Sequence, residues 1–140
     1  MTGEGAVSGT AEMIAGMDPV LDEQPYIFAV LGDGENPPTF AFACVREAEG
    51  TTVVLPTGSE ESGPSFARIT LQVQSGLLGV GLTAAVATAL AEHAIACNVV
   101  AGFYHDHLFV PWDRRHDALN LLEKLAARSA KSEFGAPEGR

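Results

Sequence analysis

Hydrophobic and polar residues alternate with a period of two in the clearest stretch of the chain, 66–73 (FARITLQV). Ala67, Ile69 and Leu71 fall on one side of this stretch, and Arg68 and Thr70 fall on the other. Such alternation predicts a β-strand with one face on a core and one face toward solvent. Shorter apolar runs predict five more strands, over 26–31, 40–47, 51–55, 95–104 and 108–110.

Three segments instead carry apolar residues at spacings of three and four, which predicts amphipathic helices over 8–17, 82–93 and 114–127. We expect Ser8 or Thr10 to cap the first helix. The second helix is rich in alanine and places Leu82, Val86 and Leu90 on one side. Small alanine side chains allow this helix to lie close to a sheet.

The loop 56–64 (PTGSEESGP) divides the chain into halves at 9–63 and 64–127. The polar ends, 1–8 and 128–140, are predicted to be disordered or flexible. The second half reads strand, helix, strand, strand, helix, which is five of the six elements of a βαββαβ ferredoxin-like unit. The whole chain is therefore predicted to be α+β, with an antiparallel or mixed sheet and helices on one face. Each half alone is too small for its own core, so we expect one continuous sheet.

Charge and composition limit the classes of partner. Eighteen acidic residues against eight basic ones leave a net charge of −10, and the basic residues are scattered. This argues against nucleic acid and anionic membranes as partners. No apolar run approaches the roughly 20 residues that span a bilayer, and the first residues lack a signal-peptide pattern, so we expect a cytoplasmic protein. Cys44 and Cys97 lie in apolar runs without zinc-site spacing, and both are expected to be buried free thiols.

Three glycines, Gly76, Gly79 and Gly81, precede the second helix. Their backbone N–H groups and the helix N-terminus can hold a carboxylate. The same glycines can equally serve only to turn a strand sharply into a helix. Asn98 lies among apolar residues in a strand that we expect to be central, where a buried amide needs a partner in a ligand or in a neighbouring loop.

The tripeptide His105-Asp106-His107 is the other chemical feature. Two histidines at period two share one face of a strand and, with an acid, can ligate a divalent metal. Asp106 can instead orient a histidine base, or the three residues can form a polar turn. No third ligand is evident, so we expect no metal and no other cofactor.

Sequence motifs in the second half resemble a known family. The segments 81–86 (GLTAAV), 95–102 (IACNVVAG) and 104–111 (YHDHLFVP) resemble small bacterial tandem ACT-domain proteins, which are related to the regulatory ACT domains of aspartokinase. The segments 17–21 (MDPVL), 46–50 (REAEG) and 52–56 (TVVLP) extend the resemblance, more loosely, into the first half.

The resemblance implies two ACT-like halves in tandem, an amino-acid-binding regulatory role rather than an enzyme, and a homodimer. It places a ligand at the connection before the second helix and on the following strand. The implied ligand-binding residues are Ser75, Gly76, Gly79, Val80, Gly81, Thr83, Cys97, Asn98 and Val99. Two alternatives remain, a small ferredoxin-fold enzyme that uses His105, Asp106 and His107, and a structural subunit without a ligand.

Overall fold

The sheet has six strands in the computed structural model, which describes residues 9–57, 63–74 and 76–135. The strands are β1 (Pro19–Val30), β2 (Ala43–Glu47), β3 (Gly50–Pro56), β4 (Phe66–Leu71), β5 (Asn98–Ala101) and β6 (Asp106–Pro111). Their order is β2-β3-β1-β4-β6-β5, and every neighbouring pair is antiparallel. The predicted α+β class and the single continuous sheet are both confirmed.

Strand β1 is much longer than the predicted 26–31 because it begins at Pro19. Its first part pairs with β4 and its second part with β3, and the register shifts between Leu21 and Pro25. Prolines and acidic residues disfavour a strand interior, and this irregularity accommodates them. The order β1-β4-β6-β5 is that of a ferredoxin-like unit in which β1, from earlier in the chain, replaces the missing last strand.

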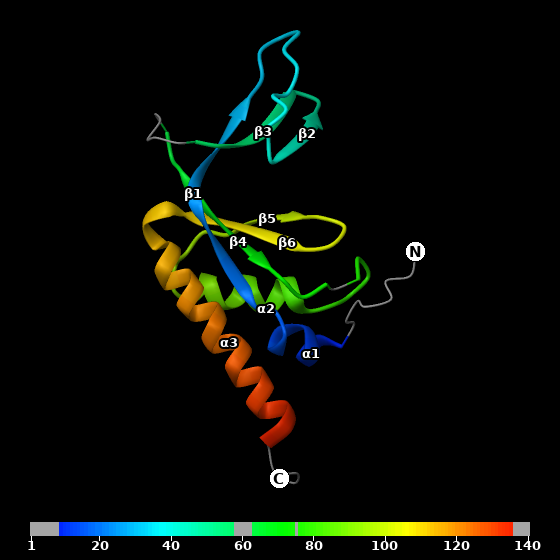
Figure 1. The fold of residues 1–140 in the computed structure, drawn as a ribbon, viewed down its shortest axis with the longest axis vertical. Helices are drawn as coiled ribbons and strands as arrows, with labels where there is room; N and C mark the ends of the chain where they lie inside the picture. The colour runs from blue at the N-terminus through cyan, green and yellow to red at the C-terminus, as the bar shows by residue number, and fades with distance from the viewer. Residues whose placement is uncertain (1–8, 58–62, 75, 136–140) are drawn as a thin grey trace.

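Three helices cover one face of the sheet around β4 and β6: α1 (Thr10–Ala15), α2 (Leu82–Ala91) and α3 (Arg115–Gly135) (Figure 1). The predicted alternation in β4 is confirmed, because Ala67, Ile69 and Leu71 face these helices and are at most 1% exposed. The buried core on this side comprises Met13, Met17, Ala67, Ile69, Leu71, Val73, Leu82, Val86, Leu90, Ile95, Leu108, Val110, Ala118 and Leu122.

The last helix corrects the prediction of a flexible tail from residue 128. Helix α3 continues to Gly135, and Ser129 Oγ donates a hydrogen bond of 3.1 Å to the carbonyl of Ala11. The helix-forming alanine, lysine and glutamate residues of 128–135 support this extension. The predicted disordered ends, 1–8 and 136–140, lie outside the described residues.

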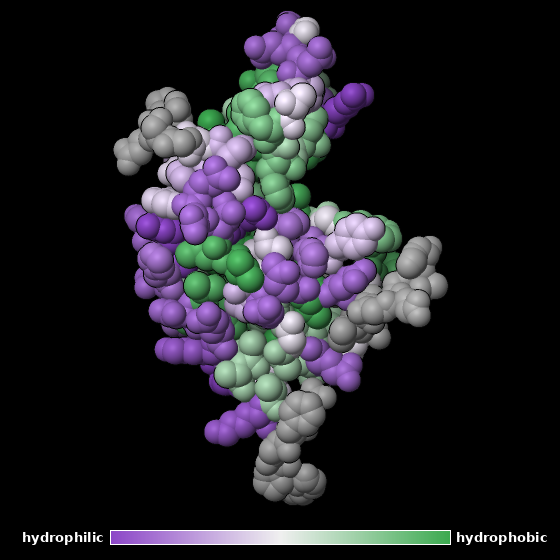
Figure 2. Space-filling model, in the orientation of Figure 1, coloured by the Kyte–Doolittle hydropathy of each residue, from purple (hydrophilic) through white to green (hydrophobic). Residues whose placement is uncertain are grey.

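The opposite face of the sheet carries no helix among the described residues. Phe109 is fully buried there, and its ring packs edge to face against those of Tyr26, Phe28 and Phe42. The ring centres lie 5.5, 5.5 and 5.7 Å from that of Phe109, respectively. Phe42 precedes β2, so the chain before that strand folds over part of this open face. The β2–β3 end stands away from the helices (Figure 1), and Figure 2 shows hydrophobic surface there.

Candidate ligand-binding sites

The glycine-rich connection between β4 and α2 is tied to helix α1. Gly81 has φ of +105°, and a Cβ there would lie 2.6 Å from Thr10 Cγ2. Only glycine adopts this conformation and permits this approach without strain. Thr10 Oγ1 donates a 2.6 Å hydrogen bond to the carbonyl of Val80. The prediction that Ser8 or Thr10 caps α1 was wrong, because Gly9 occupies the N-cap position.

A hollow of about 170 Å³, which we call the glycine hollow, lies between this connection and the β5–β6 turn. Four of the implied ligand residues line it, namely Gly76, Gly79, Gly81 and Thr83. Helix α2 begins at this hollow with no side-chain cap, and its first backbone bond joins Ala85 N to Gly81 O. The N–H groups of residues 82–84 therefore have no partner within the helix and form a positive end beside the hollow.

Asp106 and His105 line the other side of the same hollow. Asp106 pairs with Ala101 at the start of β6, on the side of the sheet that Leu108 and the helices occupy. Burial raises the pKa of the Asp106 carboxyl, and the nearby His105 lowers it by a smaller amount. The hollow thus presents a partly desolvated carboxylate opposite a helix N-terminus.

The remaining implied residues lie elsewhere. Asn98 lines a different hollow with Phe28 and Phe66, and it is exposed. The expectation of a buried amide in a central strand was wrong because β5 is an edge strand next to β6, not next to β4. Val99 is 37% exposed on the same strand.

Two further residues of that set border the glycine connection or the core. Cys97 packs against the core, and burial raises its pKa. Val80 is 74% exposed beside the glycine hollow. Ser75 lies outside the described residues. Cys44, expected to be buried, is exposed because β2 is the other edge strand.

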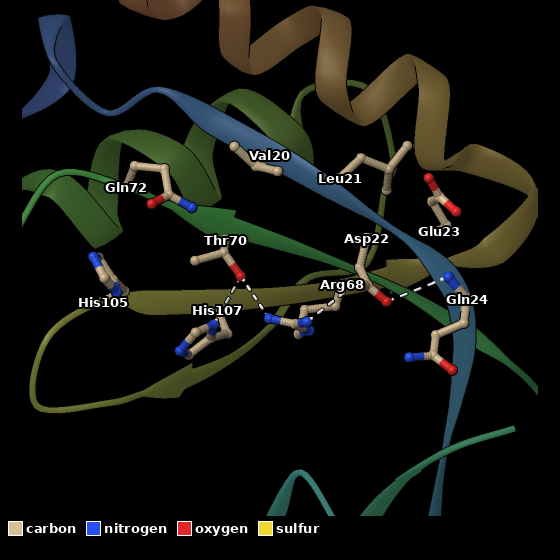
Figure 3. A pocket seen from close by; sticks show the side chains of 10 residues that line it. All are labelled: Val20, Leu21, Asp22, Glu23, Gln24, Arg68, Thr70, Gln72, His105 and His107. Carbon is tan, nitrogen blue, oxygen red and sulfur yellow. Dashed lines mark hydrogen bonds and ion pairs between the residues drawn. The ribbon is translucent and has the colours of Figure 1, made fainter.

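A larger hollow of about 800 Å³, which we call the open-face hollow, lies on the face of the sheet that the helices leave open. Arg68 is at its centre (Figure 3). The guanidinium group of Arg68 donates to Tyr26 Oη at 3.1 Å, to Thr70 Oγ1 at 2.9 Å and to Asp22 Oδ1 at 3.2 Å. The central carbon of this group, Arg68 Cζ, also lies 4.7 Å from the centre of the Phe42 ring. Arg68 is therefore held on several sides although its side chain is 20% exposed.

His107 extends this network from β6. Its Nδ1 lies 2.9 Å from Thr70 Oγ1. Burial lowers the pKa of His107, and the charges of Arg68 and His105 lower it further. Because the Thr70 oxygen already accepts from Arg68, its single hydrogen is available to a neutral His107 Nδ1.

The tripeptide 105–107 does not form one site. His107 lines the open-face hollow, Asp106 lines the glycine hollow, and His105 borders both. Alternation along β6 separates these side chains. Among the residues that the structure describes, no group of three His, Cys, Asp or Glu side chains is arranged to hold a metal ion.

Sequence reasoning missed the open-face hollow. The signal was the series Arg68, Thr70 and Gln72 at alternate positions of the segment 66–73, which was interpreted only as a solvated face. The residues from β1 were not recognised because 19–25 was not predicted to be a strand.

The comparisons with known proteins agree with this architecture. An ACT domain model matches residues 7–62, and a second ACT domain model matches residues 62–124. The chain belongs to the ACT-domain family. The two tandem ACT domains that the motifs suggested are thus confirmed, and ACT domains are commonly regulatory modules that bind small molecules.

Two solved structures are similar to the chain. A Vibrio cholerae protein of unknown function, described as a possible transport protein, is 40% identical with a TM-score of 0.67; the match covers 81% of this chain and 92% of that one. An Agrobacterium tumefaciens protein is 20% identical with a TM-score of 0.61, covering 74% and 84%. The second likeness concerns the fold alone.

A search of curated protein sequences found no match. In the described part of the chain, no helix is long and apolar enough to cross a membrane.

Proposed function

We propose that this protein is a non-catalytic regulatory module that binds an amino acid in the glycine hollow. The observation that carries the proposal is the pairing of opposite charges across that hollow. The N-terminus of α2 and the glycine backbone lie on one side, and Asp106 lies on the other.

An amino acid at neutral pH carries a carboxylate and an ammonium group a short distance apart. The unpartnered N–H groups at the start of α2 suit the carboxylate. The Asp106 carboxylate, whose pKa burial raises, gains a compensating positive charge when an ammonium group binds beside it. The hollow of about 170 Å³ suits a small molecule rather than a large cofactor.

Response to the ligand is proposed to occur through association of the chain with itself or with a partner protein. Strands β2 and β5 form the two edges of the sheet, and neither pairs with a further strand among the described residues. Exposed Leu77, Leu78 and Phe103 lie on the connection and the turn that border the glycine hollow. A bound amino acid therefore lies next to apolar surface that an associating chain can cover.

A thermal-shift screen against the standard amino acids tests the proposal. Because a ligand that binds only the folded state raises the melting temperature, we expect one or a few amino acids to do so in a concentration-dependent way. The Asp106→Asn protein should lose that response. A screen in which no amino acid raises the melting temperature would refute the proposal.

A further inference from the structure

The open-face hollow around Arg68 is separate from the glycine hollow and has a different chemical character. Side chains from three adjacent strands line it, with Asp22 and Gln24 from β1, Arg68 and Thr70 from β4, and His107 from β6. They lie on the face that the helices do not cover (Figure 3). At about 800 Å³ it is several times larger than the glycine hollow.

Arg68 and Asp22, which face each other in this hollow, already neutralise each other's charge. Arg68 forms its ion pair with Asp22 at 3.2 Å, and Asp22 also accepts from Tyr26 Oη at 3.1 Å and from Gln24 N at 3.3 Å. Glu23 adds a second negative charge at the rim. The two carboxylates disfavour a simple anion, and a simple cation would have to compete with Arg68 for Asp22.

What the hollow still offers is hydrogen bonding. A guanidinium group has five N–H donors, and Arg68 uses three of them on Tyr26, Thr70 and Asp22. One N–H on each terminal nitrogen therefore remains. The Asp22 carboxylate retains acceptor capacity after its three bonds. The exposed amides of Gln24 and Gln72 add both donors and acceptors.

Hydroxyl groups are the ligand groups that use such a mixture best, because each one donates and accepts. We propose that the open-face hollow binds a neutral molecule rich in hydroxyl groups, of the sugar or polyol class. Its hydroxyls accept from the remaining Arg68 N–H groups and donate to Asp22. The paired Arg68 and Asp22 are held in place before the ligand arrives, which lowers the ordering cost of binding.

Amide chemical shifts measured by NMR during titration test this proposal on the whole chain. The probes are glucose, galactose, mannose, ribose, glycerol and myo-inositol, added singly. At least one should give saturable shifts at the amides of 20–24, 68–72 and 107, with little change at 79–83. The amides of 79–83 report on the glycine hollow, so binding at the open-face hollow is tested independently of binding at the glycine hollow.

Variants sharpen the test. Gln72→Leu alters an exposed side chain of the hollow, and Gln74→Leu alters a nearby glutamine that does not line it. Gln72→Leu should weaken binding about tenfold, Arg68→Lys should weaken it further by removing the planar fork, and Gln74→Leu should leave it intact. The proposal is overturned if no probe gives saturable shifts at these amides, or if Arg68→Lys binds as the parent does.

Discussion

Arg68 on β4 and Asp22 on β1 join the two ACT domains by an ion pair of 3.2 Å on the open face of the sheet. The two side chains are only 20% and 28% exposed, and Tyr26 bonds to both. The central strand β1 therefore connects the domains through polar side chains on one face and through the hydrophobic core on the other.

Removing the charge of Asp22 should destabilise the protein. Asp22→Asn keeps the shape but leaves the half-buried guanidinium of Arg68 without its counterion, so we expect a loss of about 1–2 kcal/mol, discounted for partial exposure. Urea unfolding measures the change. Asp33→Asn, in the exposed loop before β2, is the matched control and should change stability by less than about 0.5 kcal/mol. Equal effects of the two substitutions would contradict a stabilising role for the pair.

Gly81→Ala should be costly for two separable reasons. The position has φ of +105°, and the new Cβ would lie 2.6 Å from Thr10 Cγ2. Gly34→Ala, at φ of +79° with nothing within 4 Å, carries the backbone cost alone, about 1 kcal/mol. Gly81→Ala should exceed that loss by about 1 kcal/mol or more because of the overlap with Thr10. Equal losses in thermal unfolding would mean that α1 moves away freely.

Acidification should destabilise the protein through His107. Its folded pKa lies below the usual 6.5, so as the pH falls the unfolded chain takes up this proton first and unfolding becomes more favourable. The contribution of neutral His107 to stability is fully present above about pH 6.5, and it is lost as the pH falls toward the pKa of the folded state. His107→Gln should flatten the dependence of melting temperature on pH between about 5 and 7.

The raised pKa of Asp106 acts in the opposite direction, because the folded state then binds a proton more readily than the unfolded chain. Asp106 is present in both the parent and the His107→Gln protein, so its contribution is common to the two sets of melting temperatures. If the parent and the His107→Gln protein show the same slope between about pH 5 and 7, the histidine does not carry the effect.

The chain should associate into homodimers, since in the part of the chain that the structure describes each edge strand has a neighbour on one side alone. Light scattering at micromolar concentration measures the mass. A value near 29 kDa, twice the chain mass of 14.6 kDa, is expected, and a value near the chain mass itself would contradict association.

The sequence predicted the strands and helices whose periodicity was strong, and it predicted the tandem ACT arrangement through its motifs. Strand β4 and helix α2 lie as their alternating and helical patterns indicate. The first part of β1 was missed because Pro19, Asp22 and Pro25 disfavour a strand locally, and only pairing with β4 stabilises it.

The candidate sites were less predictable because they depend on strand order. The predicted ferredoxin-like unit implies that β6 lies between β4 and β5, but the apolar neighbours of Asn98 in the sequence favoured a central strand instead of this edge position. That order moves Asn98 away from the glycines and brings Asp106 to them. Likewise Asp22 and Arg68, which are 46 residues apart in the sequence, come together only because β1 pairs with β4.

The central claim is that one amino acid binds between the N-terminus of α2 and Asp106. Isothermal titration calorimetry tests it most directly, with the amino acid that the thermal screen selects and three proteins: the parent, Asp106→Asn and Asn98→Ala. Asp106→Asn should weaken binding by about 1–3 kcal/mol because the ligand ammonium loses its charged partner. Asn98→Ala, in a different hollow, should bind as the parent does. Unchanged affinity in Asp106→Asn, or a loss confined to Asn98→Ala, would contradict the account.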